Sequence, residues 1–183
     1  MNAKIEPYFS LEIDDQALIY QVRFKVENLQ HFLQYLRSIG KQSKITLICF
    51  NREAMVGISH VKTAIQFALR SFSSDSPISR SIEVEALLFA AGTRQTGLVG
   101  PFGIHTGDNE SYLCVLPPRE EIKEKLENVM EFVYQDDWEK LSREKIERLK
   151  DLYGISEAEI TISGVGRLPD LVMERVALLN VNR

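Results

Sequence analysis

The sequence predicts a single mixed α/β (α+β) domain in which a mostly antiparallel sheet packs against several helices. The apolar patterns follow one another as strand, helix, strand, two helices, strand and further helices, without the regular strand–helix alternation of a parallel sheet. The 183 residues suit one domain rather than two, and no linker, repeat or low-complexity segment divides them. We therefore expect residues 1–183 to form one domain, with the helices mostly on one face of the sheet.

Three segments have the patterns of strands. From Leu18 to Val26, apolar residues alternate with polar ones, as in a strand with one solvated face. Residues 45–50 and 112–116 are short, almost continuously apolar and rich in branched side chains. This composition is typical of central strands that are covered on both faces. Two prolines follow residue 116 and cannot continue a central strand.

Apolar residues three and four positions apart predict the helices. The first helix follows the first strand and is expected to stop at Gly40. The second covers residues 59–72, with Ser59 as its N-cap. The third, over residues 81–91, is apolar almost all round, which predicts a core helix that Gly92 ends in a left-handed conformation. Further helices are expected over 122–133, from Ser142, from a capping box at Ser156–Glu159, and over 171–179 with Asp170 as the cap.

Composition and charge exclude several classes of protein. Hydrophobic residues make up 44% and charged residues 26%, which excludes a disordered chain, and the net charge of −4 excludes a surface that is basic throughout. The start of the chain has no apolar signal region, and the apolar run 86–91 is far shorter than the about 20 residues that cross a bilayer. We expect a cytoplasmic protein without a membrane partner. Cys49 and Cys114 lie in apolar runs and are expected to be buried free thiols, with one cross-sheet disulfide as the alternative.

A search for catalytic and metal-binding motifs finds none. His31, His60 and His105 lack the spacing of paired metal ligands. The glycine spacing of 92–97 matches the start of a P-loop, but the required Lys and Ser/Thr are missing. The sequence therefore predicts no enzyme, no catalytic residue, no metal and no cofactor. An enzyme remains an alternative if a pocket gathers His60 or His105 with a carboxylate.

One segment, residues 59–104, carries a group of side chains that could contact phosphates. Its basic and polar candidates are Lys62, Arg70, Arg80, Arg94 and Gln95. The backbone N–H groups of residues 93–95 would add further donors at the end of the third helix. The alternative is that these side chains belong to ordinary solvated helix faces.

Three stretches of this segment resemble a known family. They are His60-Val-Lys-Thr-Ala-Ile-Gln-Phe-Ala68, Glu85-Ala-Leu-Leu-Phe-Ala-Ala-Gly-Thr-Arg-Gln95 and Phe102-Gly-Ile104. Together they resemble the accessory subunit of the KEOPS complex, the Cgi family, which is related to the eukaryotic PRPK-binding protein (TPRKB). The tail Leu171-Val-Met-Glu-Arg-Val-Ala-Leu-Leu179 is similar to the ending of archaeal members. Thr96 departs from the family, which usually has an aliphatic residue there.

The resemblance implies a non-catalytic subunit. KEOPS helps to install threonylcarbamoyl-adenosine next to the anticodon of tRNAs that read codons starting with A, and its transferase subunit performs the chemistry. The accessory subunit binds and regulates the small atypical kinase/ATPase of the complex and helps to recruit tRNA, with archaeal members engaging the 3′ CCA end. The resemblance therefore implies the kinase and tRNA as direct partners and the transferase as an indirect one.

The resemblance also implies site residues. Arg94 would bind a phosphate and Gln95 a base or sugar edge, with a hydrogen-bonded cap as the alternative for both. Lys62, Arg70 and Arg80 would attract phosphates without specificity, and His60 would stack on a terminal base or, alternatively, be a half-buried structural residue. Glu85 is expected to be structural, anchoring the Gly92 turn or a neighbouring helix. The kinase would bind at least one edge of the apolar last helix, with Leu171, Val172, Val176 and Leu179 as the candidate residues. Burial in the protein's own core is the alternative for these positions.

A second class of function stays open beside this one. The turn from Gly92 to Gly103 could bind an anion, which would make the chain a small-molecule-binding regulatory domain. The two classes differ in what binds: tRNA and a kinase in the first, and an anionic metabolite in the second.

Overall fold

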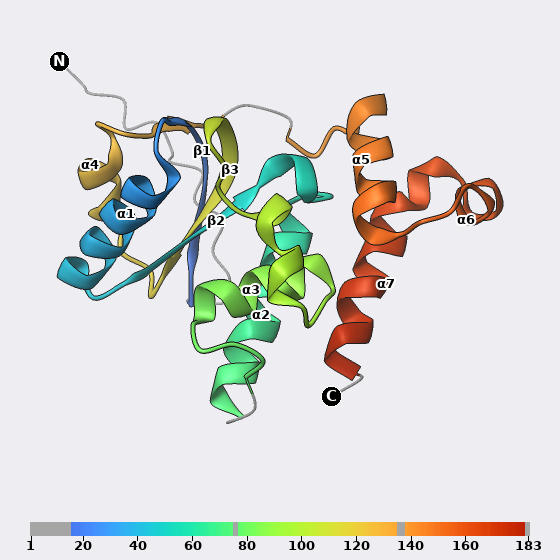
Figure 1. Ribbon diagram of the computed structural model, residues 1–183, viewed down its shortest axis with the longest axis horizontal. Helices are drawn as coiled ribbons and strands as arrows, with labels where there is room; N and C mark the ends of the chain where they lie inside the picture. The colour runs from blue at the N-terminus through green and yellow to red at the C-terminus, as the bar shows by residue number, and fades with distance from the viewer. Residues whose placement is uncertain (1–15, 75–76, 135–137, 182–183) are drawn as a thin grey trace, which may run out of the picture.

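The structure is a computed structural model that describes residues 16–74, 77–134 and 138–181. A four-stranded antiparallel sheet lies between two layers of helices, in the order β2-β3-β1-β4 (Figure 1). The strands are β1 (Leu18–Val26), β2 (Thr46–Asn51), β3 (Gly107–Leu116) and β4 (Glu131–Val133). The helices are α1 (Leu29–Ser43), α2 (Ile58–Ser73), α3 (Ile82–Ala91), α4 (Ile122–Leu126), α5 (Arg143–Tyr153), α6 (Glu157–Ser163) and α7 (Leu168–Val181), with 3₁₀ turns η1 (Arg52–Ala54), η2 (Thr96–Leu98), η3 (Gly100–Phe102) and η4 (Val165–Arg167). The predicted α+β architecture with an antiparallel sheet is confirmed.

The centre of the sheet is the pair β1 and β3, which are in register from Leu18↔Val115 to Val26↔Gly107. The predicted alternation in β1 is confirmed, because its even-numbered apolar side chains are buried while Lys25 is exposed. The prediction that residues 45–50 form a central strand is wrong, since β2 is an edge strand. The run is apolar because helices cover both faces of β2. An apolar run indicates that a strand is buried on both faces, but it does not indicate whether one or two strands pair with it.

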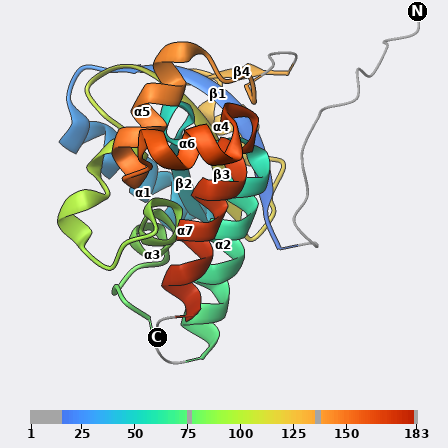
Figure 2. The ribbon, with the colours of Figure 1, turned by 90° about the vertical axis from the view of Figure 1, so that its right-hand side faces the viewer.

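The sheet has an apolar core on each face. On one face, α1 and α4 pack over the even-numbered residues of β1 and over Leu113 and Val115 of β3. On the other, helices α2, α3, α5 and α7 pack over Ile19, Ile48 and the remaining β3 residues (Figures 1 and 2). The expectation of helices mostly on one face is therefore incomplete, because α1 and α4 close the second face.

The two cysteines are buried free thiols, as predicted. Cys49 belongs to the core beneath α1, whereas Cys114 belongs to the core on the opposite face of the sheet. The two side chains therefore point away from each other, which excludes the cross-sheet disulfide. Burial raises the pKa of the Cys49 thiol to about 12 and that of Cys114 further still, so both remain protonated at neutral pH.

The first helix passes through Gly40 instead of stopping there. Helix α1 ends three residues later, and Lys44 is its left-handed cap with φ of 53°. Gly40 is needed for close packing, because a Cβ there would lie 2.8 Å from the carbonyl oxygen of Ile45, where the chain turns back into β2. The amide of Ile45 donates to the Gly40 carbonyl at 2.9 Å.

Three other predicted boundaries are wrong and four are confirmed. Helix α2 begins after Gly57 rather than at Ser59, and α7 begins at Leu168, so that Asp170 lies inside it. The predicted helix over 122–133 is short α4 followed by β4, whose pairing with the edge of β1 replaces the later helical turns. The confirmed boundaries are the caps at Ser81, Gly92 and Ser142 and the capping box at Ser156.

No helix among residues 16–74, 77–134 and 138–181 combines the length and the apolar character that a membrane span requires.

Glu85 is a buried carboxylate that fixes the connection between α2 and α3. It accepts hydrogen bonds from the backbone amides of Ile78 at 3.0 Å and Ser79 at 2.7 Å. The hydroxyl of Ser71 on α2 also donates to it. This contact with a neighbouring helix is one of the two structural roles expected for Glu85, and the side chain faces away from any surface that a ligand could reach.

We predict that Glu85→Ala lowers the free energy of unfolding by about 2–4 kcal/mol, because it removes the acceptor of two half-buried amides and of the buried Ser71 hydroxyl. Urea unfolding measures this as a lower midpoint at an unchanged m-value. The matched control is Glu83→Ala in the same helical turn, which loses about 1 kcal/mol or less of helix-dipole interaction. Equal midpoints for the two variants would contradict this role.

Candidate functional site

Helices α2 and α3 form an antiparallel pair that positions the residues predicted to contact RNA. The buried stripe of α2, with Val61, Ala64 and Ala68, faces the almost wholly apolar α3. At one end of the pair, Nε2 of His60 donates to the carbonyl of Ala90 at 2.9 Å. The Ser71–Glu85 hydrogen bond lies at the other end. The candidate residues are therefore divided between two ends of one rigid hairpin.

The structure does not bring all of the basic candidates together. Arg94 and Gln95 are exposed directly after Gly92, and half-buried Lys62 lies toward this same end of the hairpin. Arg70 and Arg80 are exposed at the opposite end, where α2 ends and α3 begins. Lys62 and Arg70 are eight residues apart, which corresponds to about 12 Å along the helix axis. A single ligand group can reach one end or the other, and only a long ligand can reach both.

Arg70 lines a polar surface hollow of about 370 Å³. Gln16, immediately before the sheet begins, and Gln66 on α2 also line it. The sequence places Gln66 and Arg70 on one helix face, but the approach of Gln16 depends on long-range packing that no local pattern encodes.

His60 is fully buried, and the prediction that it stacks on a base is wrong. Its Nδ1 accepts from the amide of Val56 at 3.4 Å, so that Nε2 carries the proton donated to Ala90. The hydroxyl of Tyr153 on α5 lies 3.4 Å from Nε2 and 2.9 Å from the same carbonyl. Burial lowers the pKa of His60 to about 4, so the ring is neutral at pH 7. His60 thus connects α2, α3 and α5 inside the core.

The backbone of the turn after Gly92 offers fewer donors than expected. The amide of Thr93 donates to the carbonyl of Leu88 at 3.1 Å, and that of Gln95 donates to the hydroxyl of Thr93 at 3.2 Å. Two of the three amides predicted to face a phosphate are therefore used within the turn. Gly92 has φ of 62°, and a Cβ there would lie 3.2 Å from the carbonyl oxygen of Arg175 on α7. Helix α7 therefore holds the turn in place. The turn exposes the side chains of Arg94 and Gln95, whereas two of its amides are already hydrogen-bonded.

Most of the residues predicted to bind the kinase lie in the protein's own core. Val172, Val176 and Leu179 are buried, and Leu171 is half-buried. The expectation that they form a docking surface is wrong for the first three, because α7 packs against α2, α3 and α5. The exposed apolar side chains of α7 are instead Leu178, 47% exposed, and Val181, 74% exposed. A helix that is apolar all round does not reveal which side faces solvent.

The catalytic alternative finds no support in the positions of the histidines. His60 is enclosed as described, and the ring of exposed His105 contacts the carbonyl of Thr106. Neither histidine is among the residues that line the polar hollow beside Arg70 or a second hollow between α1 and α3. Within the ranges that the structure describes, no group of three or more His, Cys, Asp or Glu residues could hold a metal ion.

Sequence reasoning missed a group of charged side chains beside β3, of which Lys145 is buried and the others are half-buried. Lys145 of α5 is almost fully buried, its Nζ lies 3.4 Å from the carbonyl of Trp138, and burial lowers its pKa to about 8. The guanidinium of Arg52 lies 5.4 Å from the Trp138 ring centroid and pairs with Glu110. Glu110 also accepts from Arg23 at 2.8 Å. These contacts hold η1 and α5 against the sheet, and in the sequence Lys145 has the appearance of an ordinary surface charge.

No protein-family model matches this sequence, and a search of curated proteins finds no match either. The resemblance to the KEOPS accessory subunits therefore remains an expectation from the residues quoted above.

We predict that His60 makes the stability depend on acidic pH. The folded-state pKa of about 4 lies below the ordinary value of 6.5, so the unfolded chain binds the proton first as pH falls. The contribution of His60 to the free energy of unfolding is complete above pH 6.5. This contribution, about 3 kcal/mol in total, is lost as the pH falls from 6.5 to 4.

In His60→Gln, the loss of unfolding free energy between pH 6.5 and 4.5 should be smaller by about 2 kcal/mol than in the unmodified protein. Urea midpoints across this pH range measure the difference. The control is His31→Gln at an exposed position of α1. The same reduction in both variants, or none in His60→Gln, would show that His60 is not the group responsible.

Proposed function

We propose that this chain is a non-catalytic adaptor of the KEOPS type, which binds the small kinase/ATPase and helps to recruit tRNA for threonylcarbamoyl-adenosine formation in the cytoplasm. The observation that carries the proposal is that the stretches resembling the family pack against one another. His60 bonds to Ala90, and the segment 102–104 lies against α3, where Gly103 approaches Leu87. The resembling tail lies in α7, which contacts both α2 and α3.

This packing explains how residues separated by more than a hundred positions form one structural unit. Gly92 is required by its positive φ and by the backbone of Arg175, and His60 is required by its partners in the core. The motifs therefore encode one rigid unit. Arg94 and Gln95, the polar residues that end the second stretch, are exposed on this unit.

The proposed tRNA contact is the end of the hairpin with Arg94, Gln95 and Lys62. Arginine and lysine neutralise phosphates, and an amide side chain can pair with a base or sugar edge. The net charge of −4 does not oppose this contact, since one subunit of a larger assembly supplies only part of the RNA footprint. Arg70 and Arg80 would attract the backbone of a long RNA from the second end.

The proposed kinase contact is the exposed edge of α7 together with α6 and η4. Leu178 and Val181 of α7 are exposed apolar residues, and Ile162 and Val165 add two more on the preceding segment. Exposed apolar side chains suit a protein partner better than RNA. In this arrangement the chain holds a kinase and a tRNA on different elements and makes or breaks no covalent bond.

The tRNA contact predicts that Arg94→Ala and Lys62→Ala each weaken tRNA binding by up to about tenfold at 0.1 M salt, and each lowers the slope of log K against log salt by about 1. Filter binding or fluorescence anisotropy over a salt series measures both quantities. The matched control is Arg148→Ala on exposed α5. Affinity and slope that stay the same in both test variants, or fall equally in the control, would refute the contact.

The kinase contact predicts that Leu178→Glu abolishes co-purification with the KEOPS kinase of the same genome while the urea midpoint stays within about 0.5 kcal/mol of the unmodified protein. Tyr35→Glu provides the control, because it places the same charge at an exposed aromatic residue of α1. If the kinase is retained by Leu178→Glu, or lost from Tyr35→Glu as well, the edge of α7 is not the docking surface.

A further inference from the structure

The outer edge of β2 is open. This strand pairs with β3 on one side only, as the end of the sheet order β2-β3-β1-β4. In an antiparallel pair, every second residue turns its N–H and C=O away from the partner strand. Among the residues that the structure describes, Thr46–Phe50 make no backbone hydrogen bond beyond those of the sheet. The edge therefore offers peptide groups in the alternating pattern that another strand would bind.

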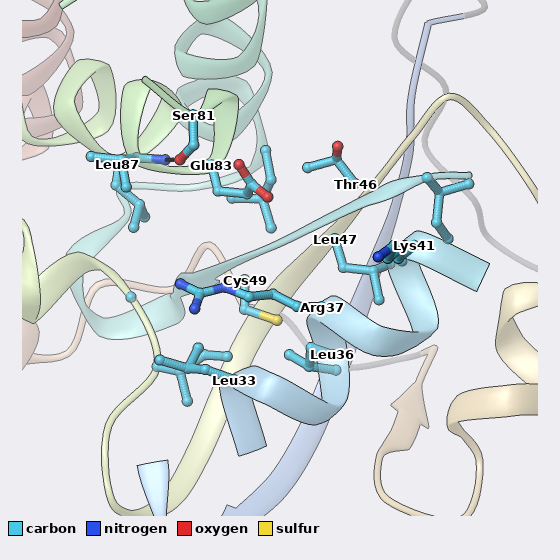
Figure 3. A pocket seen from close by; sticks show the side chains of 16 residues that line it. Leu33, Leu36, Arg37, Lys41, Thr46, Leu47, Cys49, Ser81, Glu83 and Leu87 are labelled. Atoms are coloured by element: carbon cyan, nitrogen blue, oxygen red, sulfur yellow. Dashed lines mark hydrogen bonds between the residues drawn. The ribbon is translucent and has the colours of Figure 1, made fainter. Parts of the chain in front are cut away.

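This edge forms the floor of a groove of about 430 Å³ between α1 and α3 (Figure 3). Leu33 and Leu36 of α1 line one wall, and Leu87 of α3 lines the other. Glycine at 103 and the side chain of Ile104 also line it. A strand edge between two partly apolar walls can hold both the backbone and the alternate side chains of an extended peptide.

The wall formed by α1 is basic. Helix α1 contains no Asp or Glu, and its Arg37 and Lys41 both line the groove (Figure 3). These two residues are four positions apart, so their Cα atoms are about 6 Å apart along the helix. In a strand, residues on the same face recur every two positions, which is about 6.7 Å. Because α1 contacts β2 along the groove, both cations can reach those side chains of an added strand that face α1.

The wall formed by α3 favours a different kind of side chain from a bound strand. Val84 and Leu87 of α3 give it an apolar character, while Glu83 would repel an acidic group there. A strand in the groove would thus direct its acidic residues toward α1 and the residue between them toward α3.

We propose that the open edge of β2 binds an extended segment of a partner protein as a fifth strand, and that this segment has the pattern acidic–apolar–acidic. The main-chain hydrogen bonds to β2 supply the sequence-independent part of the affinity, and Arg37 and Lys41 select the acidic residues. The groove uses neither Arg94 nor the edge of α7, so this inference does not rest on the adaptor function proposed above.

The test uses the full chain and the fluorescein-labelled peptide Thr-Val-Asp-Val-Asp-Val-Thr in anisotropy titrations. We expect saturable binding, a loss of at least tenfold in Arg37→Glu and in Lys41→Glu, and no change in the control Arg148→Glu. A peptide with Lys in place of both Asp residues should bind at least tenfold more weakly. Two further peptides carry an N-methyl group on the central Val or on the Asp after it. Neighbouring residues of a strand turn their N–H groups to opposite sides, so one of these peptides loses a donor to β2 and should bind at least tenfold more weakly.

Hydrogen exchange supplies an independent readout. Saturation with the peptide should slow exchange of outward-facing amides in residues 46–50, which a purely electrostatic contact with α1 would not do. Absence of binding, unweakened binding of both N-methylated peptides, or unchanged affinity in both α1 variants would overturn the proposal. Displacement of the peptide by single-stranded oligouridylate would assign the groove to RNA, and a dimer that dissociates in Arg37→Glu would assign it to a second copy, so either result also overturns it.

Discussion

The nine-residue pairing of β1 with β3 is the constraint on which the rest of the structure depends. It produces a rigid sheet with two apolar faces, each of which must be covered by helices. Helices α1 and α4 cover one face, and α2, α3, α5 and α7 cover the other. Because β2 is added outside this pair and lies between the two helical layers, its outer edge becomes the floor of the groove between α1 and α3.

Buried polar groups determine how the second layer is held. His60 joins α2 to the end of α3 and to Tyr153 of α5, and Glu85 joins the other end of the same hairpin. Lys145 and Arg52 fix α5 and η1 beside the sheet. His60, Glu85 and Lys145 are costly to bury unless they are paired, so each of them excludes arrangements that would leave it without partners. They explain why the turn after Gly92 has a defined position although two short 3₁₀ turns follow it.

The sequence predicts those features that are decided by nearby residues. Ser81, Gly92, Ser142 and Ser156 end or begin helices as expected, because a cap depends on groups within four positions of it. It fails where distant residues decide: β4 forms because the edge of β1 is available, and Gly40 is set by the returning chain. The candidate site shows the same division. Arg94 and Gln95 are exposed, as expected for residues that directly follow the helix-ending Gly92. The burial of His60 and of Val172, in contrast, depends on α3, α5 and α7.

The basic and apolar candidates for binding lie on different elements, and this separation has a physical consequence. A helix that contributes its apolar residues to the core can present only its remaining side chains to a partner, so the buried face of α7 and the buried stripe of α2 contribute rigidity rather than contacts. The exposed edge of α7, the end of the α2–α3 hairpin and the basic wall of α1 belong to one rigid core but share none of the residues that define them. Ligands at these surfaces would therefore contact different side chains, and an adaptor of the proposed kind requires such a division.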